Sequence, residues 1–348
     1  MDLTSRQQHI IHALLKNDND SLSNIIKLPE FSEITERTLQ RDINELIKAG
    51  LVKRHGEARA ITYSVTLLGR IGLTLPDQLL EQIFAEEERN DLRYDFERLD
   101  ILRDNKLFTA KETSKLDEYN AVFQGKLKTA SQDIIRRERE RITIELSWKS
   151  SQFEGNTYSL IETETLLKEG LPAPGKTQEE TTMVLNHKKA LDFAESHKDL
   201  FASQLDMRSV IELHRLLAVG LFEGGIRERL VGITGSAYKP LENKFQIEEE
   251  LKRLCDVISS KSVVYEKALL AFSYICYLQP FNDGNKRTGR ILANAILYAN
   301  NCFPLSLRAV NVNTYKLAIL AFYELGIIGN VKQVFTDQAK FAAENYAI

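Results

Sequence analysis

Residues 279–290, QPFNDGNKRTGR, interrupt two apolar stretches whose hydrophobic residues recur at helical spacing. Ala268–Leu278, just before them, has the pattern of a buried helix, and the same pattern resumes after them. Pro280 and Gly284 are typical of a loop, so we expect a second core helix to begin near Asn285–Arg287. The sequence therefore predicts a mainly helical domain in which one loop is held between two buried helices.

This loop contains the residues of a phosphate-binding site. A helix N-terminus presents unpaired backbone N–H groups and a partial positive charge, and a preceding glycine such as Gly284 lets the backbone approach a phosphate closely. Arg287 and Arg290 are three residues apart and therefore share one helix face, where guanidinium groups can bind phosphate oxygens in pairs. Asp283 is placed to hold Mg²⁺ against those phosphates. Together they predict a site for a polyphosphate and a magnesium ion.

Composition and charge narrow the class of protein. The chain has 348 residues, of which 43% are hydrophobic and 27% charged, which is typical of a soluble globular protein with room for two domains. The net charge of -3 gives no overall positive field that would attract nucleic acid. Its widely spaced cysteines predict reduced, buried thiols: Cys255, Cys276 and Cys302. We find neither a signal peptide nor a membrane-spanning run, so we expect a cytoplasmic protein with no membrane partner.

The loop resembles the core motif of the Fic (filamentation induced by cAMP) family, H-x-F-x-[DE]-G-N-[GK]-R-x-x-R. The matching residues are Phe281, Asp283, Gly284, Asn285, Lys286, Arg287 and Arg290. The resemblance extends over roughly residues 145–345, and it implies a Fic (Fido) helical fold over residues 141–348. It also implies an enzyme that moves a nucleotide monophosphate, usually AMP from ATP, onto a protein hydroxyl.

The same resemblance implies a role for each matching residue. Asp283 would bind Mg²⁺, Gly284 and Asn285 would line an anion hole, and the two arginines, Arg287 and Arg290, would hold the outer phosphates. Phe281 would anchor the loop in the core. The residues expected at ATP and at the catalytic centre are therefore Gln279, Asp283, Gly284, Asn285, Lys286, Arg287 and Arg290.

Gln279 stands where the family motif has its histidine. A histidine accepts a proton near neutral pH and a glutamine amide does not, and a general base typically contributes about 10²–10⁴ in rate. Three interpretations stay open: a slow nucleotidyltransferase, a pseudoenzyme that binds ATP as a signal, or a different phosphate chemistry. Lys286 also occurs in the phosphate-transferring branch of the family, which leaves the transferred group open. His187 and His214 are interpreted as hydrogen-bonded helix residues, and no pattern predicts a transition-metal site.

Residues 150–156, SSQFEGN, resemble the inhibitory helix motif of the family, [ST]-x-x-x-E-[GN]. The motif residues are Ser150, Glu154 and Gly155, within a helix expected over about residues 145–156. Glu154 could pair with Arg290 in place of a γ-phosphate and so compete with productive ATP binding. The alternative is an ordinary helix end that Gly155 terminates.

Residues 230–241 resemble the flap of the family, which pairs with an extended segment of a target protein. Short β-prone pieces separated by Gly232, Gly235 and Pro240 predict a hairpin in an otherwise helical region. Its candidate docking residues are Ile233, Thr234 and Gly235, which would align the target by backbone pairing. The alternative is a structural hairpin without a partner.

The first seventy residues predict a separate winged helix-turn-helix, and residues 71–140 a charged helical connector. Helix, helix, longer helix and hairpin follow in that order, and TLQRDINEL at 38–46 with GLV at 50–52 resembles the DeoR-type winged helix. The resemblance implies DNA contact through Arg37, Thr38, Gln40 and Arg41. The unit is nearly neutral, so a protein-docking or dimerisation role stays open.

These observations lead to two hypotheses. The first is a Fic-type protein adenylyltransferase that uses ATP and Mg²⁺ and whose activity is low or autoinhibited because of Gln279 and Glu154. The second is a catalytically inactive, nucleotide-sensing transcriptional regulator that binds DNA through its winged helix. The target protein at the flap, the operator and the oligomeric state, including a homodimer, stay open.

Overall fold

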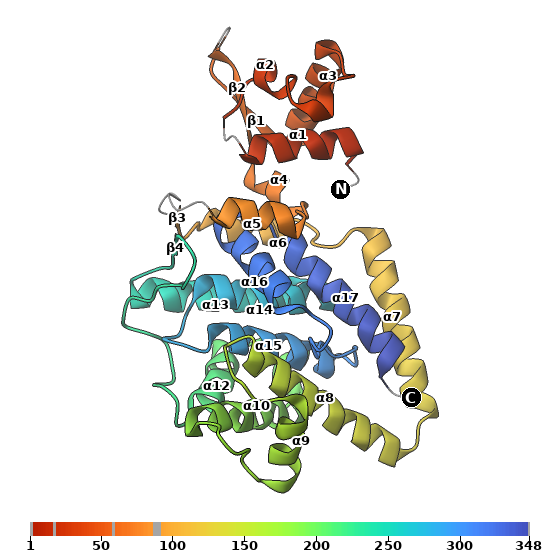
Figure 1. Cartoon of the computed structure of the whole chain (residues 1–348), viewed down its shortest axis with the longest axis vertical. Helices are drawn as coiled ribbons and strands as arrows, with labels where there is room; N and C mark the ends of the chain where they lie inside the picture. Colours follow the sequence, from red (N-terminus) through yellow and green to blue (C-terminus); the bar gives the residue numbers. More distant parts are fainter. Residues whose placement is uncertain (1–2, 17–18, 58–59, 86–91, 347–348) are drawn as a thin grey trace.

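Helices form most of this computed structural model, which describes residues 3–16, 19–57, 60–85 and 92–346 (Figure 1). A small N-terminal unit lies at one end of the molecule and a larger helical body forms the rest (Figure 1). The mainly helical fold expected from the sequence is confirmed. No helix in the described part of the chain is both long enough and apolar enough to cross a membrane.

The N-terminal unit consists of short helices and one hairpin. In chain order it contains α1 (Ser5–Lys16), α2 (Leu22–Ile25), a 3₁₀ turn η1 (Pro29–Phe31), α3 (Glu36–Lys48) and the antiparallel strands β1 (Val52–His55) and β2 (Thr62–Val65). The hydroxyl of Thr35 accepts a hydrogen bond from the backbone N–H of Thr38 and so caps α3, and Gly50 follows the helix at φ +72°. The element order agrees with that expected for a winged helix.

Two helices, α4 (Leu67–Ile71) and α5 (Asp77–Ala85), connect this unit to the body. The side chain of Asn330 holds both backbone groups of Leu75, at 3.0 and 2.7 Å. Arg70 donates to the carbonyl of Leu325 at 3.3 Å. Leu317 and Ile327 belong to the same apolar cluster as the core of the N-terminal unit, so the two parts are packed together.

The body is a set of helices packed around α14 (Val264–Leu278) and α15 (Asn285–Ala299), which lie side by side. A Cβ on Gly289 would lie 3.0 Å from the carbonyl oxygen of Ala271, so glycine permits this close approach. The surrounding elements are β3 (Leu92–Arg93), α6 (Glu97–Asp104), α7 (Ala110–Thr129), α8 (Gln132–Gln152), α9 (Leu160–Glu169), α10 (Gln178–Ser196), α11 (Asp199–Ala202), α12 (Met207–Ala218), β4 (Tyr238–Lys239), α13 (Lys244–Ser260), α16 (Val312–Leu320), the π-helical turn η3 (Ala321–Leu325) and α17 (Gly329–Asn345).

The segment that resembles the inhibitory motif lies at the end of a long helix and does not form a short helix of its own. The helix expected over about residues 145–156 is α8, which begins at Gln132, and its hydroxyl cap is Ser131. It continues without a break through residue 140, where the connector was expected to end. The alternating charges of its first half made that half resemble a connector, because most of its side chains face solvent.

The hairpin expected over residues 230–241 is absent, and that prediction is wrong. Only Tyr238–Lys239 (β4) is a strand, and it pairs in parallel with Leu92–Arg93 (β3), far away in sequence. The carboxylate of Glu324 accepts hydrogen bonds from the hydroxyl of Ser236, at 2.6 Å, and from the N–H of Ala237, at 3.0 Å. The segment is therefore held by η3 and β3, and not by pairing with itself.

Candidate active site

The predicted loop lies where the sequence placed it, between the end of α14 and the start of α15. Gln279 ends α14 with φ +50° and Gly284 precedes α15 with φ +76°, so the backbone turns through two left-handed positions. Phe281 is fully buried and its ring stacks on that of His214, with centroids 3.7 Å apart. Phe281 therefore anchors the loop, and the backbone N–H groups at the start of α15 are available to an anion.

The side chain of Gln279 is turned inward and holds the loop closed. Its Nε2 donates to the carbonyl of Cys276 at 2.6 Å, and its Oε1 accepts from Nδ2 of Asn285 at 2.8 Å. Asn285 also spans the loop through both backbone groups of Phe281, at 3.0 and 2.9 Å. The two amide side chains therefore bond to each other and to the loop, so Asn285 can contribute to an anion hole through its backbone N–H.

Arg290 is the most enclosed cation of the site. Its side chain is 0% exposed, and each of its three nitrogens donates a hydrogen bond. Nε bonds the hydroxyl of Ser150 at 2.7 Å, Nη1 bonds the hydroxyl of Tyr315 at 2.9 Å, and Nη2 bonds the carbonyl of Ser150 at 3.0 Å. Nη2 also bonds Oε1 of Glu154 at 2.7 Å, the pair that the sequence resemblance implied.

Glu154 joins two cations of the loop. Its Oε1 pairs with Arg290 and its Oε2 lies 2.9 Å from Nζ of Lys286. Burial alone would raise the pKa of Glu154, but the positive charges of Arg290 and Lys286 and their hydrogen bonds outweigh it and lower the pKa to about 2. The carboxylate is therefore ionised at neutral pH, and it occupies the position from which an anion would contact both cations.

Two donor groups of Arg287 are unsatisfied. The guanidinium is almost fully buried, and its Nη2 pairs with Oδ2 of Asp283 at 3.0 Å. Its Nε and Nη1 find no hydrogen-bond partner among the residues that the structure describes. Buried donors are nearly always paired in folded proteins, so these two groups indicate that an acceptor outside the chain belongs beside them.

Asp283 is an exposed carboxylate at the mouth of this cluster, with 65% of its side chain exposed. No group of three or more histidine, cysteine or acidic side chains in the described ranges could hold a metal ion by itself. Mg²⁺ bound to nucleotides usually takes one or two protein carboxylates together with phosphate oxygens and water. Asp283 beside the unpaired nitrogens of Arg287 fits that kind of site, with the phosphates as the remaining ligands.

A chain of hydrogen bonds connects the end of α8 to α10 through His187. Nδ1 of His187 donates to the carbonyl of Met183 at 3.1 Å, so its Nε2 accepts the hydroxyl hydrogen of Ser150 at 2.7 Å. Ser150 in turn accepts from Arg290. Burial and, secondarily, the charges of Arg287 and Arg290 lower the pKa of His187 to about 3. As expected, this histidine is a hydrogen-bonded helix residue.

His214 supports the opposite side of the loop. Its Nδ1 accepts from the N–H of Gly225 at 3.2 Å and its Nε2 donates to the carbonyl of Asp283 at 3.0 Å. Burial lowers the pKa of His214 to about 4, against the opposing effect of the bond to Asp283. The ring is therefore neutral at physiological pH and positions Asp283 through its backbone.

These two histidines should make the protein lose stability as the pH falls below about 6.5. Their folded-state pKa values lie below the ordinary 6.5, so in acid the unfolded chain binds protons that the folded chain does not. The stabilisation is complete above 6.5 and is lost as the pH falls toward 4 and then 3. At about pH 5 each histidine should account for a loss of roughly 2 kcal/mol.

Urea unfolding at about pH 7 and about pH 5 measures this loss. The variant His187→Gln should show a smaller difference between the two conditions than the wild type. The matched variant of an exposed histidine, His197→Gln, should show the wild-type difference. An unchanged pH dependence in His187→Gln would remove this histidine from the explanation.

The sequence did not single out Arg227, which fastens the loop to the segment before α13. Its side chain is buried and donates to the carbonyls of Gln279 at 2.6 Å, Arg229 at 3.0 Å and Leu241. Its own N–H bonds the carbonyl of Pro280 at 3.0 Å. It lies in no motif that we recognised, and every side-chain partner is a backbone carbonyl, so no residue pattern could have identified it.

The other predicted residues lie outside this cluster. Ile233 packs against the main core, whereas Thr234 and Gly235 are exposed on the segment that β4 and Glu324 hold. Arg37 and Arg41 are exposed on α3, and that helix belongs to the N-terminal unit, apart from α15 in the middle of the body (Figure 1). The four DNA candidates, Arg37, Thr38, Gln40 and Arg41, therefore form a separate surface from the loop.

Comparisons with known proteins agree with this fold and loop. Residues 204–297 match the family model of the Fic/DOC family. Solved structures with the same fold include residues 134–508 of Fic-1 from Caenorhabditis elegans, with a TM-score of 0.56, 19% identity and 100% of each chain covered. A Fic-domain-containing signalling protein from Bacteroides thetaiotaomicron aligns with a TM-score of 0.53 and 17% identity over 66% of this chain and 96% of its own. The chain therefore contains a Fic/DOC domain within a Fic-type helical fold.

Curated relatives are similar to this chain over about half of its length. The protein adenylyltransferase fic-1 of Caenorhabditis elegans is 29% identical over 181 residues, which cover 50% of this chain and 35% of the relative. The protein adenylyltransferase Fic of Nematostella vectensis is 29% identical over 175 residues, which cover 48% and 40%. The match thus spans well under half the length of these relatives.

Proposed function

We propose that this chain binds ATP with Mg²⁺ at the start of α15 and transfers AMP to a hydroxyl of a target protein, and that Glu154 and Gln279 restrain this activity. The observation that carries the proposal is the ion cluster of the loop. Lys286, Arg287 and Arg290 converge there, and one carboxylate, Glu154, already occupies two of them at 2.7 and 2.9 Å. The names of the curated relatives support adenylyl transfer.

The charges explain how the segment after α8 could control nucleotide binding. Three cations face two carboxylates, Glu154 and Asp283, so the cluster is left with one unbalanced positive charge. Moving Glu154 away would leave two, and a triphosphate would then find Arg290 free to donate from Nη2. Because Nη2 cannot serve both carboxylate and phosphate in this geometry, Glu154 and ATP would compete.

In the proposed reaction, the hydroxyl oxygen of the target attacks the α-phosphorus, the bond from that phosphorus to the pyrophosphate breaks, and pyrophosphate leaves. Arg287 and Arg290 would hold the negative charge of the outer phosphates, and the backbone N–H groups at the start of α15 would bind an oxygen of the transferred group. Asp283 would hold Mg²⁺, which would supply further positive charge there. The hydroxyl proton passes to solvent or to a phosphate oxygen, because Gln279 has no basic site.

The position of a radioactive phosphorus in ATP tests which group is transferred. Label retained on protein from the α-position and not from the γ-position identifies AMP. Label from the γ-position identifies phosphate, the alternative that Lys286 left open. The proposal would be contradicted if the wild type and the Glu154→Gly variant both failed to bind ATP and both failed to transfer label.

Replacing Asp283 with alanine should remove the Mg²⁺ dependence of ATP binding. The wild type should bind ATP at least about tenfold more tightly with Mg²⁺ than with a chelator, because the metal ion joins Asp283 to the phosphates. In Asp283→Ala the two affinities should be nearly equal. Calorimetry measures both, and the exposed control Asp337→Ala on α17 should behave as the wild type. A full Mg²⁺ effect in Asp283→Ala would rule out this carboxylate as the ligand.

DNA binding by the N-terminal unit is the second candidate function. The exposed face of α3 carries Arg37, Arg41 and Lys48, and β1 adds Lys53 and Arg54, all with exposed side chains. Such a face could contact DNA phosphates and base edges. Arg41→Ala should weaken a salt-dependent shift of DNA in a gel, whereas Lys16→Ala, at the end of α1, should leave it unchanged. Binding that is absent at low salt would favour protein docking instead.

A further inference from the structure

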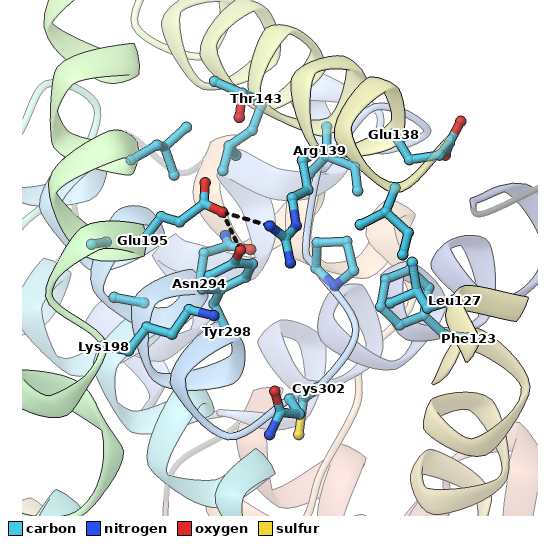
Figure 2. Close-up of a pocket in the computed structure, with 18 of the residues that line it drawn as sticks. Phe123, Leu127, Glu138, Arg139, Thr143, Glu195, Lys198, Asn294, Tyr298 and Cys302 are labelled. Carbon is cyan, nitrogen blue, oxygen red and sulfur yellow. Dashed lines mark hydrogen bonds and ion pairs between the residues drawn. The ribbon is translucent and has the colours of Figure 1, made fainter. Parts of the chain in front are cut away.

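A cavity of about 230 Å³ lies between α7, α8, α10 and α15, and none of its lining residues belongs to the loop at 279–290 (Figure 2). Its walls are mainly apolar, with Leu127 on α7, Ile142 and Leu146 on α8, Leu191 on α10 and Ala295 on α15. It meets α15 through the second half of that helix, whereas the phosphate-binding residues occupy the first half. The cavity is therefore distinct from the proposed ATP site.

One edge of this cavity is polar and carries two acids, Glu138 and Glu195, and two bases, Arg139 and Lys198. Glu138 pairs with Arg141 on the same helix. Nη1 of Arg139 lies 3.2 Å from Oε1 of Glu195, and the hydroxyl of Tyr298 donates to the same carboxylate (Figure 2). Arg139 is thus already neutralised. Nζ of Lys198 lies 4.2 Å from the centre of the Tyr298 ring and has neither an ion pair nor a hydrogen bond within the described part of the chain. The edge therefore offers one cation that is free to pair with an anion.

We propose that this cavity binds a small amphipathic anion, an apolar ring or short acyl chain whose carboxylate pairs with Lys198. An apolar interior with a few convergent polar groups is the usual form of a small-molecule site. The apolar body of the ligand would lie between Leu146 and Leu191, and the flexible lysine can bring its ammonium to the head group while its stem covers apolar surface. The negative charge of Glu195 would repel an anion whose head group does not pair with Lys198.

The position of α8 connects this cavity to the inhibitory segment. The first half of α8 lines the cavity on one side and a second surface hollow on the other, and most of its side chains from Gln132 to Glu140 are exposed. The last turn of the same helix carries Ser150, and Glu154 follows it. A ligand that packs against Ile135 and Ile142 would hold the exposed first half of α8, so it should also order the turn that holds Glu154. That Glu154 restrains catalysis rests on the proposed function, whereas ligand binding and ordering do not.

Octanoate, a carboxylate with a short acyl chain, is the probe for this site. Calorimetry on the full chain should show one binding site, which Thr143→Phe abolishes by filling the cavity. Lys198→Met should weaken binding about tenfold, the effect expected for losing one charge-assisted hydrogen bond. Lys189→Met removes the same charge from an exposed position on α10 and should bind as the wild type. Circular dichroism checks that each variant is folded.

Two results would overturn the site: no heat with octanoate in the wild type, or equal affinity in Lys198→Met. Equal affinity for 1-octanol, which has the same tail without the charge, would overturn its preference for an anion. Amide hydrogen exchange tests the connection, because octanoate should slow exchange over residues 146–156 in the wild type and not in Thr143→Phe. Unchanged exchange in that segment would overturn the connection between the cavity and the turn that holds Glu154. Neither readout requires ATP, so failure of the proposed catalytic function would not be confused with failure here.

Discussion

Replacing Gln279 with histidine is expected to raise the rate of AMP transfer by about 10²–10⁴, the usual contribution of a general base. The reason is the proton of the target hydroxyl, which a neutral imidazole can accept and an amide cannot. The backbone at this position has φ +50°, a conformation in which histidine is among the better-tolerated residues. The cost is the loss of the bonds that the glutamine side chain makes to Cys276 and Asn285.

The measurement is the initial rate of protein labelling from ATP that carries radioactive α-phosphorus, with Mg²⁺ and a cell lysate as the source of target. Gln279→Asn is the matched control, because it also tolerates a left-handed backbone and has no basic nitrogen. Labelling that rises only in Gln279→His would show that the wild type lacks a base. Equal rates in the two variants would mean that a general base at position 279 does not limit the rate of transfer.

Replacing Glu154 with glycine should raise the affinity for ATP at least about tenfold and increase any labelling in the same proportion. The substitution removes the carboxylate from Arg290 and Lys286, so phosphate oxygens can take both positions. Arg290 keeps its bonds to Ser150 and Tyr315, so the loop should stay folded. Losing one partner of this largely buried ion pair should still lower the free energy of unfolding, on the order of 3 kcal/mol.

Calorimetry with ATP and urea unfolding measure the two effects. Glu154→Gln separates charge from shape, because the amide has nearly the same size and no negative charge. If competition by charge is the mechanism, the glutamine variant should bind ATP nearly as well as the glycine variant. An affinity equal to that of the wild type in both would contradict competition at Arg290. Combining Glu154→Gly with Gln279→His should give the fastest labelling, because the two changes act on separate steps.

The position of the loop and the start of α15 could be predicted because both depend on neighbouring residues. Pro280 and Gly284 interrupt a strong helical pattern, and the expected helix start at Asn285 is observed. The same holds for the capping of α3 by Thr35 and its end at Gly50. Local backbone preferences decide such features, and distant residues do not need to be known.

The segment at 230–241 could not be predicted in the same way. Its glycines and proline indicated turns and short strands, but the partner of β4 is Leu92–Arg93, and Glu324 accepts hydrogen bonds from the hydroxyl of Ser236 and the N–H of Ala237. Backbone pairing has no residue code that reaches across more than a hundred positions. The direction of the Gln279 side chain could not be predicted from the sequence either, since the amide could have faced a substrate or the loop.

By itself, the sequence determined which residues could bind phosphate and where two helices would enclose them, because spacing on one helix and turn chemistry are local properties. Only the tertiary structure decided that Glu154 also reaches Lys286, that Ser150 connects Arg290 to His187, and that Arg227 fastens the loop. Those contacts join residues from different helices and loops. Their strength comes from shared burial, which exists only once the helices have packed.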